Sequence, residues 1–325
     1  MENNILPWHE SVWSQLCQSA GQGRFPHALL LGGSAGIGKQ ALADRLAAWL
    51  LCERPGGAGA CGQCAACQWR AAGSHPDFRQ VAPPEGKQQI LVDQIRELSA
   101  GLALKAHGEG RKVAVIAPAE AMNPAAANSL LKTLEEPTDN TVLILVSHRP
   151  GRLMATIRSR CQQLRLPPPD PALARDWLAA QGVAEPGLAL ALAGGAPLRA
   201  LALVESGELA QRAAWAGEFE SLMRGRASPV ELAGNWHQVE GLAPLDWLAS
   251  WTGDMIRLAT GAADGLRNAD LADRLAALAQ GIEGGRLFAL LDLTQRARRL
   301  RETSVNTQLL LEELLHEWSR TARGR

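Results

Sequence analysis

The segment GGSAGIGKQ (32–40) constrains the fold of this chain more than any other feature. It follows the apolar run HALLLG (27–32) and precedes the helical pattern ALADRLAAWLL (41–51). Glycines between a strand and a helix let backbone N–H groups converge on a phosphate at the helix start. The segment therefore predicts a phosphate-binding loop (P-loop) in an α/β protein. The residues expected to form this degenerate nucleotide-binding site are Gly33, Gly36, Gly38 and Lys39.

The same loop lacks the groups that ATP hydrolysis requires. A hydroxyl that holds Mg²⁺ should follow Lys39, but Gln40 occupies that position. The acids that bind the metal and polarise water should end a later strand. The candidate strand KVAVIAP ends in Ala117 and Pro118, and the nearest acid, Glu120, comes two residues later. We expect no intrinsic ATPase and at most residual ATP binding; an autonomous P-loop ATPase with relaxed metal coordination is the alternative.

Short apolar runs alternate with helical patterns over the first half of the chain. Most of these runs are apolar almost throughout, which is typical of parallel strands covered on both faces. The alternation predicts an α/β fold with a parallel sheet. The expected strands span 27–32, 77–83, 112–118 and 141–147, and two of the expected helices span 90–104 and 123–137.

The sheet pattern ends at LRLPPPDP (164–171), because four prolines in five residues cannot continue a helix or a central strand. The rest of the chain is helical in pattern and rich in Ala and Leu. The predicted domains are an α/β domain at 1–166 with an inserted module at 52–67, a small helical domain at 167–207 and a larger helical domain at 208–325.

Four of the six cysteines fall within sixteen residues, with the spacing C-x8-C-x2-C-x2-C. Four thiolates complete the tetrahedral coordination of zinc, so the predicted site is structural and has no open position for catalysis. An iron–sulfur cluster would favour a further cysteine where Ala71 stands, and four free thiols are the other alternative. The expected zinc ligands are Cys52, Cys61, Cys64 and Cys67.

The net charge and the lack of long apolar runs argue against several classes of protein. Lys plus Arg equals Asp plus Glu, at 33 each, which argues against coating of nucleic acid by net charge. No run approaches the ~20 apolar residues that cross a bilayer, and the first residues lack a secretory signal pattern. We therefore expect a cytoplasmic protein without membrane contact, in which clustered cysteines bind metal rather than form disulfides.

Further motifs follow the P-loop and its cysteine insertion in a fixed order: GSHPDF (73–78), NSLLKTLEEP (128–137), IRSRC (157–161) and VNTQLLLEELL (305–315). Together they resemble the clamp-loader family of bacterial DNA polymerase III, and within it the delta-prime subunits. The resemblance implies an AAA+ module, a helical lid and a helical collar. It also implies an accessory subunit of a DNA-directed DNA polymerase, in a hetero-oligomer with delta and gamma/tau subunits that loads the sliding clamp on primed DNA during DNA replication.

The resemblance also assigns roles to single residues. Arg160, flanked by Ser159 and Cys161, matches the arginine finger of the family, which reaches into the ATP site of a neighbouring subunit. Such a finger neutralises charge on the transferred phosphoryl group. The alternative is a structural arginine paired with a local carboxylate. Delta-prime subunits are inactive as ATPases and act as stators, in agreement with the gaps at the P-loop. Leu198 stands in the register of the motor subunits' nucleotide-sensing arginine, with Arg199 one position later.

Overall fold

The computed structural model describes residues 5–107, 110–238, 243–300 and 305–324. The chain divides into two compact units, Met1–Leu173 and Ala174–Arg325. All strands of the described residues belong to the first unit, and the second unit is helical.

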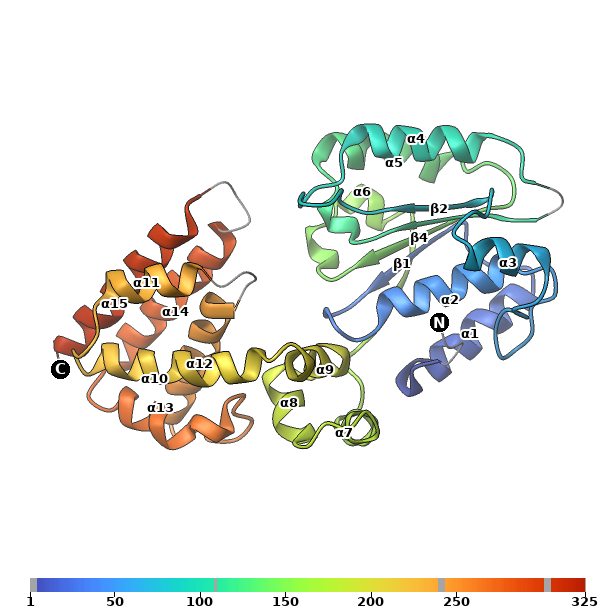
Figure 1. The fold of residues 1–325 in the computed structure, drawn as a ribbon. Helices are drawn as coiled ribbons and strands as arrows, with labels where there is room; N and C mark the ends of the chain where they lie inside the picture. Colours follow the sequence, from blue (N-terminus) through green and yellow to red (C-terminus); the bar gives the residue numbers. More distant parts are fainter. Residues whose placement is uncertain (1–4, 108–109, 239–242, 301–304, 325) are drawn as a thin grey trace. The chain divides into compact units, whose positions relative to one another are not determined.

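The first unit is built on a five-stranded sheet with the strand order β2-β3-β4-β1-β5 (Figure 1). All its strand pairs are parallel, and Leu30 of β1 stands between Leu145 of β4 and Gln163 of β5. The three central strands are buried along their whole length, as their nearly continuous apolar runs predict. The strands span Ala28–Gly32 (β1), Phe78–Val81 (β2), Lys112–Ile116 (β3), Thr141–Ser147 (β4) and Gln162–Arg165 (β5).

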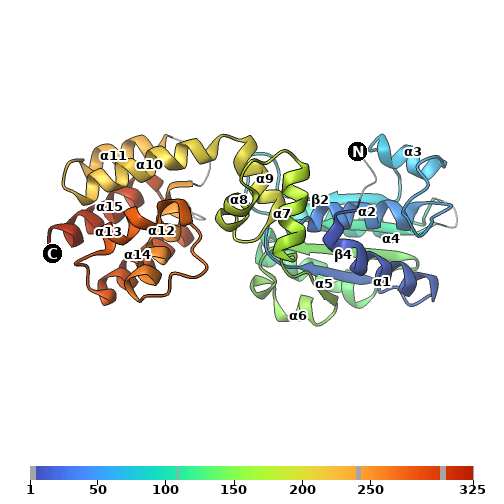
Figure 2. The same ribbon diagram turned by 90° about the horizontal axis from the view of Figure 1, so that it is seen from below.

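Helices cover both faces of this sheet (Figures 1 and 2). On one face, α4 and α5 bury Ile95 and Leu130 in a common core with the strands, and α1 and α2 lie on the other face. The predicted α/β fold with a parallel sheet is confirmed. The helices of this unit span Glu10–Gly21 (α1), Lys39–Leu51 (α2), Ala65–Ala71 (α3), Val92–Ala103 (α4), Pro124–Glu135 (α5) and Ala155–Arg158 (α6).

Local signals fix some of these elements better than others. The side chain of Asn123 accepts the N–H of Ala126 at 2.8 Å and caps α5, as its position before Pro124 predicts. The sequence pattern does not predict β5. This strand has four residues, lies at the sheet edge and is largely exposed, so it carries no apolar run.

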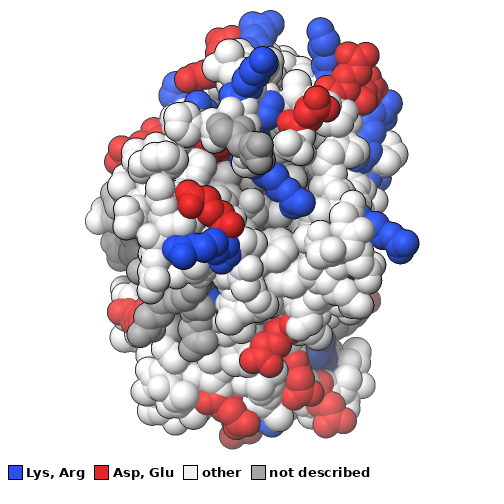
Figure 3. Space-filling model, turned by 90° about the vertical axis from the view of Figure 1, so that its right-hand side faces the viewer, with Lys and Arg blue, Asp and Glu red and all other residues white. Residues whose placement is uncertain are grey.

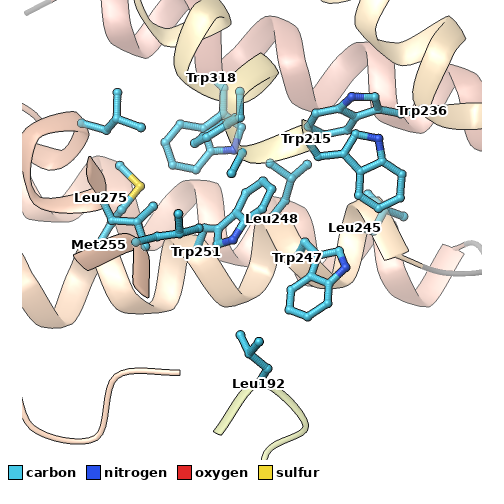
Figure 4. Packing of buried hydrophobic residues seen from close by; sticks show 14 of the residues in the cluster. Leu192, Trp215, Trp236, Leu245, Trp247, Leu248, Trp251, Met255, Leu275 and Trp318 are labelled. Atoms are coloured by element: carbon cyan, nitrogen blue, oxygen red, sulfur yellow. The ribbon is translucent and has the colours of Figure 1, made fainter. Parts of the chain in front are cut away.

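The core of the second unit is built around tryptophans (Figure 4). Trp215, Trp236, Trp251 and Trp318 are at most 1% exposed. Phe219 meets Trp318 edge-on, with 5.1 Å between the ring centroids, a favourable arrangement for an aromatic pair. The helices span Pro171–Ala180 (α7), Pro186–Leu192 (α8), Pro197–Glu205 (α9), Glu208–Met223 (α10), Pro229–His237 (α11), Ala243–Ala259 (α12), Ala272–Ala279 (α13), Gly284–Leu300 (α14) and Thr307–Arg323 (α15).

One core cluster runs from Ala174 in α7 to Trp318 in α15, so the short helices α7 to α9 share their core with the later helices. The predicted division of this unit at residue 207 stays a prediction. No single described helix is long and apolar enough to cross a membrane; α8 and α9 meet that criterion only as a pair bent by 105°, by length and composition alone. Leu190 and Leu203 of this pair are buried in the core.

Candidate functional site

The P-loop has the backbone conformation that its glycines predict. It leaves the carboxyl end of β1 and enters α2 through Gly36 and Gly38, whose φ angles of 78° and 88° are left-handed. A Cβ on Gly33 would clash with the carbonyl oxygen of Leu166 beside it. Only glycine fits these positions without strain, so the sequence specifies a loop that could cradle a phosphate.

Lys39, the basic residue of the loop, is folded into the loop itself. Its side chain is buried, and its ammonium donates a hydrogen bond to the carbonyl oxygen of Ser34 in the same loop. Burial lowers the pKa of Lys39 to about 8, opposed by the attraction of Glu120. The charge that would meet a terminal phosphate is therefore held by backbone within the loop.

Gln40, Ala117 and Pro118 occupy the positions at which the hydroxyl and acids for hydrolysis are expected. The amide of Gln40 donates to a carboxylate oxygen of Asp44 at 3.1 Å, along its own helix. Ala117 and Pro118 follow the end of β3, where the acids would stand. Neither position offers an oxygen ligand from its side chain for Mg²⁺.

Glu120 comes nearer to the loop than its sequence position suggests. One carboxylate oxygen accepts the N–H groups of His148 and Arg149 at 2.8 and 3.1 Å, at the end of β4. Its charge acts on both Lys39 and His148. The hydrogen bonds of Glu120 therefore join the turn after β3 to the end of β4, and its negative charge attracts the ammonium of Lys39 in the P-loop.

A segment before α1 covers the P-loop, a contact that the sequence reasoning missed. It is a 3₁₀ turn at Pro7–His9, and the indole of Trp8 donates to the carbonyl oxygen of Ile37 at 2.9 Å. His9 is 2% exposed, and burial lowers its pKa to about 4. Ile37 itself is fully buried. The tryptophan and proline near the chain start are the signals that could have indicated this packing.

The four predicted zinc ligands are brought together. The Sγ atoms of Cys52, Cys61, Cys64 and Cys67 lie within 4.8 Å of one another. The Cys52–Cys64 and Cys61–Cys67 sulfur pairs are each 3.9 Å apart. Ligands about 2.3 Å from one ion at tetrahedral angles stand about 3.8 Å apart, so the spacing fits zinc.

Backbone N–H groups also point at these sulfurs, as they do at thiolates. Cys61 and Arg54 donate to the Sγ of Cys52 at 3.3 and 3.4 Å, and Cys67 donates to the Sγ of Cys64 at 3.4 Å. Hydrogen bonds from the backbone of Gln63 and Cys64 lower the pKa of Cys61 to about 6. A lowered pKa favours the thiolate, which is the form that binds metal. Burial acts in the opposite direction on two other cysteines: it raises the pKa of Cys52, and it raises that of Cys67 to about 12.

Two indoles hold the cysteine module on the α/β domain. Trp13 of α1 donates to the carbonyl oxygen of Gly57 at 2.9 Å, and Trp49 of α2 donates to that of Gly56 at 2.8 Å. The two rings meet edge-on, 6.1 Å apart. On the face drawn in Figure 3, the basic and acidic side chains of the described residues stand among uncharged surface.

Arg160 lies between α6 and β5 and is held by local contacts. Its guanidinium pairs with the carboxylate of Glu135 at 2.5 Å and donates to the carbonyl oxygen of Thr156 at 3.0 Å. The side chain keeps 35% of its surface exposed. Ser159 is exposed, and its hydroxyl donates to the carbonyl oxygen of Thr156. Cys161 is buried in the core that α4 and α5 form with the sheet, and this burial raises its pKa to about 11. Cys161 is therefore a core residue, whereas Arg160 keeps part of its side chain at the surface.

Arg160 and the P-loop lie at opposite ends of neighbouring strands. β1 and β5 are parallel, with Leu29 opposite Gln162 and Gly32 opposite Arg165. The P-loop follows the carboxyl end of β1, and Arg160 precedes the amino end of β5. At about 3.3 Å per residue, four paired residues separate the two by about 13 Å. Arg160 and the P-loop therefore lie near opposite edges of this part of the sheet.

Comparison with known proteins shows the family of this chain. A family model described as "DNA polymerase III, delta subunit" matches residues 8–170, and one described as "DNA polymerase III, delta subunit, C terminal" matches residues 206–320. The DNA polymerase III subunit delta' of Pseudomonas aeruginosa is 43% identical, over 97% of this chain and 98% of its own. That of Escherichia coli strain K12 is 36% identical, over 95% of this chain and 93% of its own.

Among solved structures, a DNA polymerase III gamma subunit-related protein from Thermotoga maritima superposes with a TM-score of 0.50 at 17% identity. The match covers 97% of this chain and 100% of that one, and it bears on the fold alone. With the family models it confirms the AAA+ clamp-loader fold and its helical C-terminal part. The chain belongs to the DNA polymerase III delta-prime subunits of the clamp-loader family, as its motifs predict.

Proposed function

We propose that this chain is an ATPase-inactive subunit of the DNA polymerase III clamp loader that acts as a stator and supplies Arg160 to a neighbour's ATP site. In this role it assists ATP-dependent loading of the sliding clamp on primed DNA and carries out no chemical step at its own P-loop. Its partners would be the delta and gamma/tau subunits in a cytoplasmic hetero-oligomer. The first unit would be the AAA+ module, and the helices of the second unit would form lid and collar.

One observation carries this proposal: the lysine of the P-loop is bonded to the backbone of its own loop. Lys39 is bonded to Ser34, and Trp8 covers the loop at Ile37. ATP would have to displace the lysine contact and would then find no metal-binding hydroxyl at Gln40. A subunit with such a P-loop would contribute to the complex as a structural component and not as a site of ATP hydrolysis.

The reach of Arg160 supports the second half of the proposal. A guanidinium presents a permanent charge and a planar fork that engages two phosphate oxygens at once. Arg160 is partly exposed and lies about four strand residues away from its own P-loop. Its only use as a finger would be toward another subunit. Glu135 would hold the guanidinium in place until the neighbour presents its γ-phosphate.

Zinc fits the cysteine cluster in a structural role. Four sulfurs saturate the ion, so no position stays open for water or substrate. The ion would fix the loop between α2 and α3, where the described residues provide little other core.

The alternative, an autonomous P-loop ATPase, is favoured by the charge of Glu120 near Lys39. Steady-state ATP hydrolysis separates the two functions, measured on the isolated chain and on the complex reconstituted with delta, gamma/tau, clamp and primed DNA. We expect turnover only from the complex. Turnover by the isolated chain that is abolished in Lys39→Ala would establish the alternative.

A further inference from the structure

The second unit contains a cavity of about 100 Å³ that is lined by side chains far apart in the sequence. It lies between the end of α8, the start of α9, the first half of α12, the loop before α13 and the end of α14. Leu192 and Trp247, which also line it, are drawn in Figure 4. Its polar lining consists of Arg199, Asp246, Ser250, Arg267, Gln295 and Arg298.

The lining carries an excess of positive charge. Three arginines face one carboxylate, and that carboxylate, on Asp246, is already paired with Arg298. Arg298 also donates to the side-chain oxygen of Gln295 at 3.0 Å. Within the described residues, neither Arg199 nor Arg267 is paired with an acid. Two guanidiniums therefore remain to meet an anion.

The backbone under Arg267 is fixed by buried hydrogen bonds. Asp254 is 3% exposed and accepts the N–H groups of Arg267 and Asn268 at 3.2 and 2.7 Å. The guanidinium lies against Gly194, where a Cβ would stand 2.9 Å from Nη2. Gly194 has a φ of +68°, a backbone conformation that favours glycine. The backbone of Arg267 is thus fixed by Asp254, and its guanidinium lies beside Gly194.

A neutral donor completes the lining. The Oγ of Ser250 accepts a hydrogen bond from the side-chain amide of Asn268 at 2.9 Å, which leaves its own hydrogen free to donate. Two guanidinium forks and a hydroxyl match the oxygens of a phosphate group. A volume of about 100 Å³ is large enough for a phosphate or pyrophosphate group.

We propose that the cavity lined by Arg199, Arg267 and Arg298 binds a phosphate group, carried either by a free phosphate compound or by the backbone of nucleic acid. Recognition is by charge and hydrogen bonds alone. Every residue that lines the cavity belongs to the second unit.

The test uses the full chain and two probes. Titration calorimetry with sodium pyrophosphate measures binding of the free anion, and fluorescence anisotropy with labelled single-stranded DNA measures binding of the backbone. The double variant Arg199→Gln/Arg267→Gln removes the two unpaired guanidiniums. The matched control Arg299→Gln/Arg323→Gln removes the same net charge from exposed positions on α14 and α15 that do not line the cavity.

We expect the cavity variant to weaken pyrophosphate binding at least about tenfold and the control to change it less than about twofold. If the cavity variant also weakens DNA binding, and the slope of log affinity against log salt concentration falls by the equivalent of about one phosphate contact, the ligand is nucleic acid. If only pyrophosphate binding is weakened, the ligand is a free phosphate compound. The single variant Arg199→Gln changes an exposed position and should therefore keep the fold. It should show part of the loss of pyrophosphate binding seen in the double variant. Equal losses in the two double variants, or binding of neither probe to the wild type, would overturn the proposal.

Discussion

The guanidinium of Arg160 lies 2.5 Å from a carboxylate oxygen of Glu135, so the SRC and LEEP motifs of this chain meet in one ion pair. Both side chains are partly exposed, at 35% and 48%. An ion pair in contact with water contributes at most about 1 kcal/mol to the free energy of unfolding. Loss of Arg160 should therefore leave the fold intact, and its functional effect can be measured directly.

Arg160→Ala should reduce clamp- and DNA-stimulated ATP hydrolysis of the reconstituted complex, and clamp loading more strongly. Removal of a finger lowers the rate at the site it serves by about 10³–10⁵. Only one site of the complex would lose its finger, so total hydrolysis should fall partially. Loading requires the subunits to act together and should suffer more. The measurements are steady-state hydrolysis and clamp loading on primed DNA.

Arg158→Ala is the matched control for Arg160, because it removes an arginine two residues away at the end of α6. We expect it to assemble and to load clamps close to the wild-type rate. Wild-type loading by a correctly assembled Arg160→Ala complex would show that Arg160 serves only its pair with Glu135.

The purified chain should contain about one zinc ion, and Cys64→Ser should lower that content and destabilise the cysteine module. Cys64 is a ligand candidate and also the N-cap of α3, where its sulfur accepts the N–H of Cys67. Atomic emission gives the metal content, and proteolysis of the loop between α2 and α3 reports the local stability. Cys17→Ser, at a cysteine outside the cluster, is the control and should leave both unchanged. A zinc-free chain, or an iron–sulfur absorption band, would exclude the assignment.

The sequence predicts those strands whose residues are apolar because both faces of the strand are buried. Apolar runs identify the central strands β1, β3 and β4, which are covered on both faces. The cysteine spacing alone brings four sulfurs together, because short steps within a loop leave few other arrangements. The edge strand β5 carries no such signal, since exposure removes the need for apolar residues.

Contacts between distant segments lie beyond what periodicity can predict. The pairing of Trp8 with Ile37 joins residues 29 positions apart through one indole hydrogen bond. Glu120 is a second case, because its role depends on a turn that returns the side chain to the end of β4. Likewise, the cavity around Arg267 is assembled from five segments of the second unit, and no local pattern of the sequence brings them together.

Lys39→Ala should leave the ATPase activity of the reconstituted complex unchanged. The lysine ammonium is bonded to Ser34 within its own loop and has no metal-binding hydroxyl beside it. The substitution removes a buried charge and its hydrogen bond together, so the loop should keep its conformation through its glycines. Hydrolysis by the complex and binding of labelled ATP by the isolated chain are the measurements. A loss of complex activity comparable to that of Arg160→Ala would mean that this P-loop works.

Stability should fall in acid through the burial of His9. Burial lowers its pKa to about 4 in the folded chain from an ordinary 6.5, so protons bind the unfolded chain preferentially between these values. The contribution is complete above about pH 6.5 and decreases as the pH falls toward 4, by about 2 kcal/mol between pH 7.5 and 5. Urea unfolding at the two pH values measures it. His9→Gln cannot titrate and should show a smaller difference, although His75 and His148, whose pKa values burial also lowers, keep part of it. His237→Gln, at an exposed histidine, should behave as the wild type. If His9→Gln loses as much stability in acid as the wild type, the covering of the P-loop by the Pro7–His9 turn does not contribute to this pH dependence.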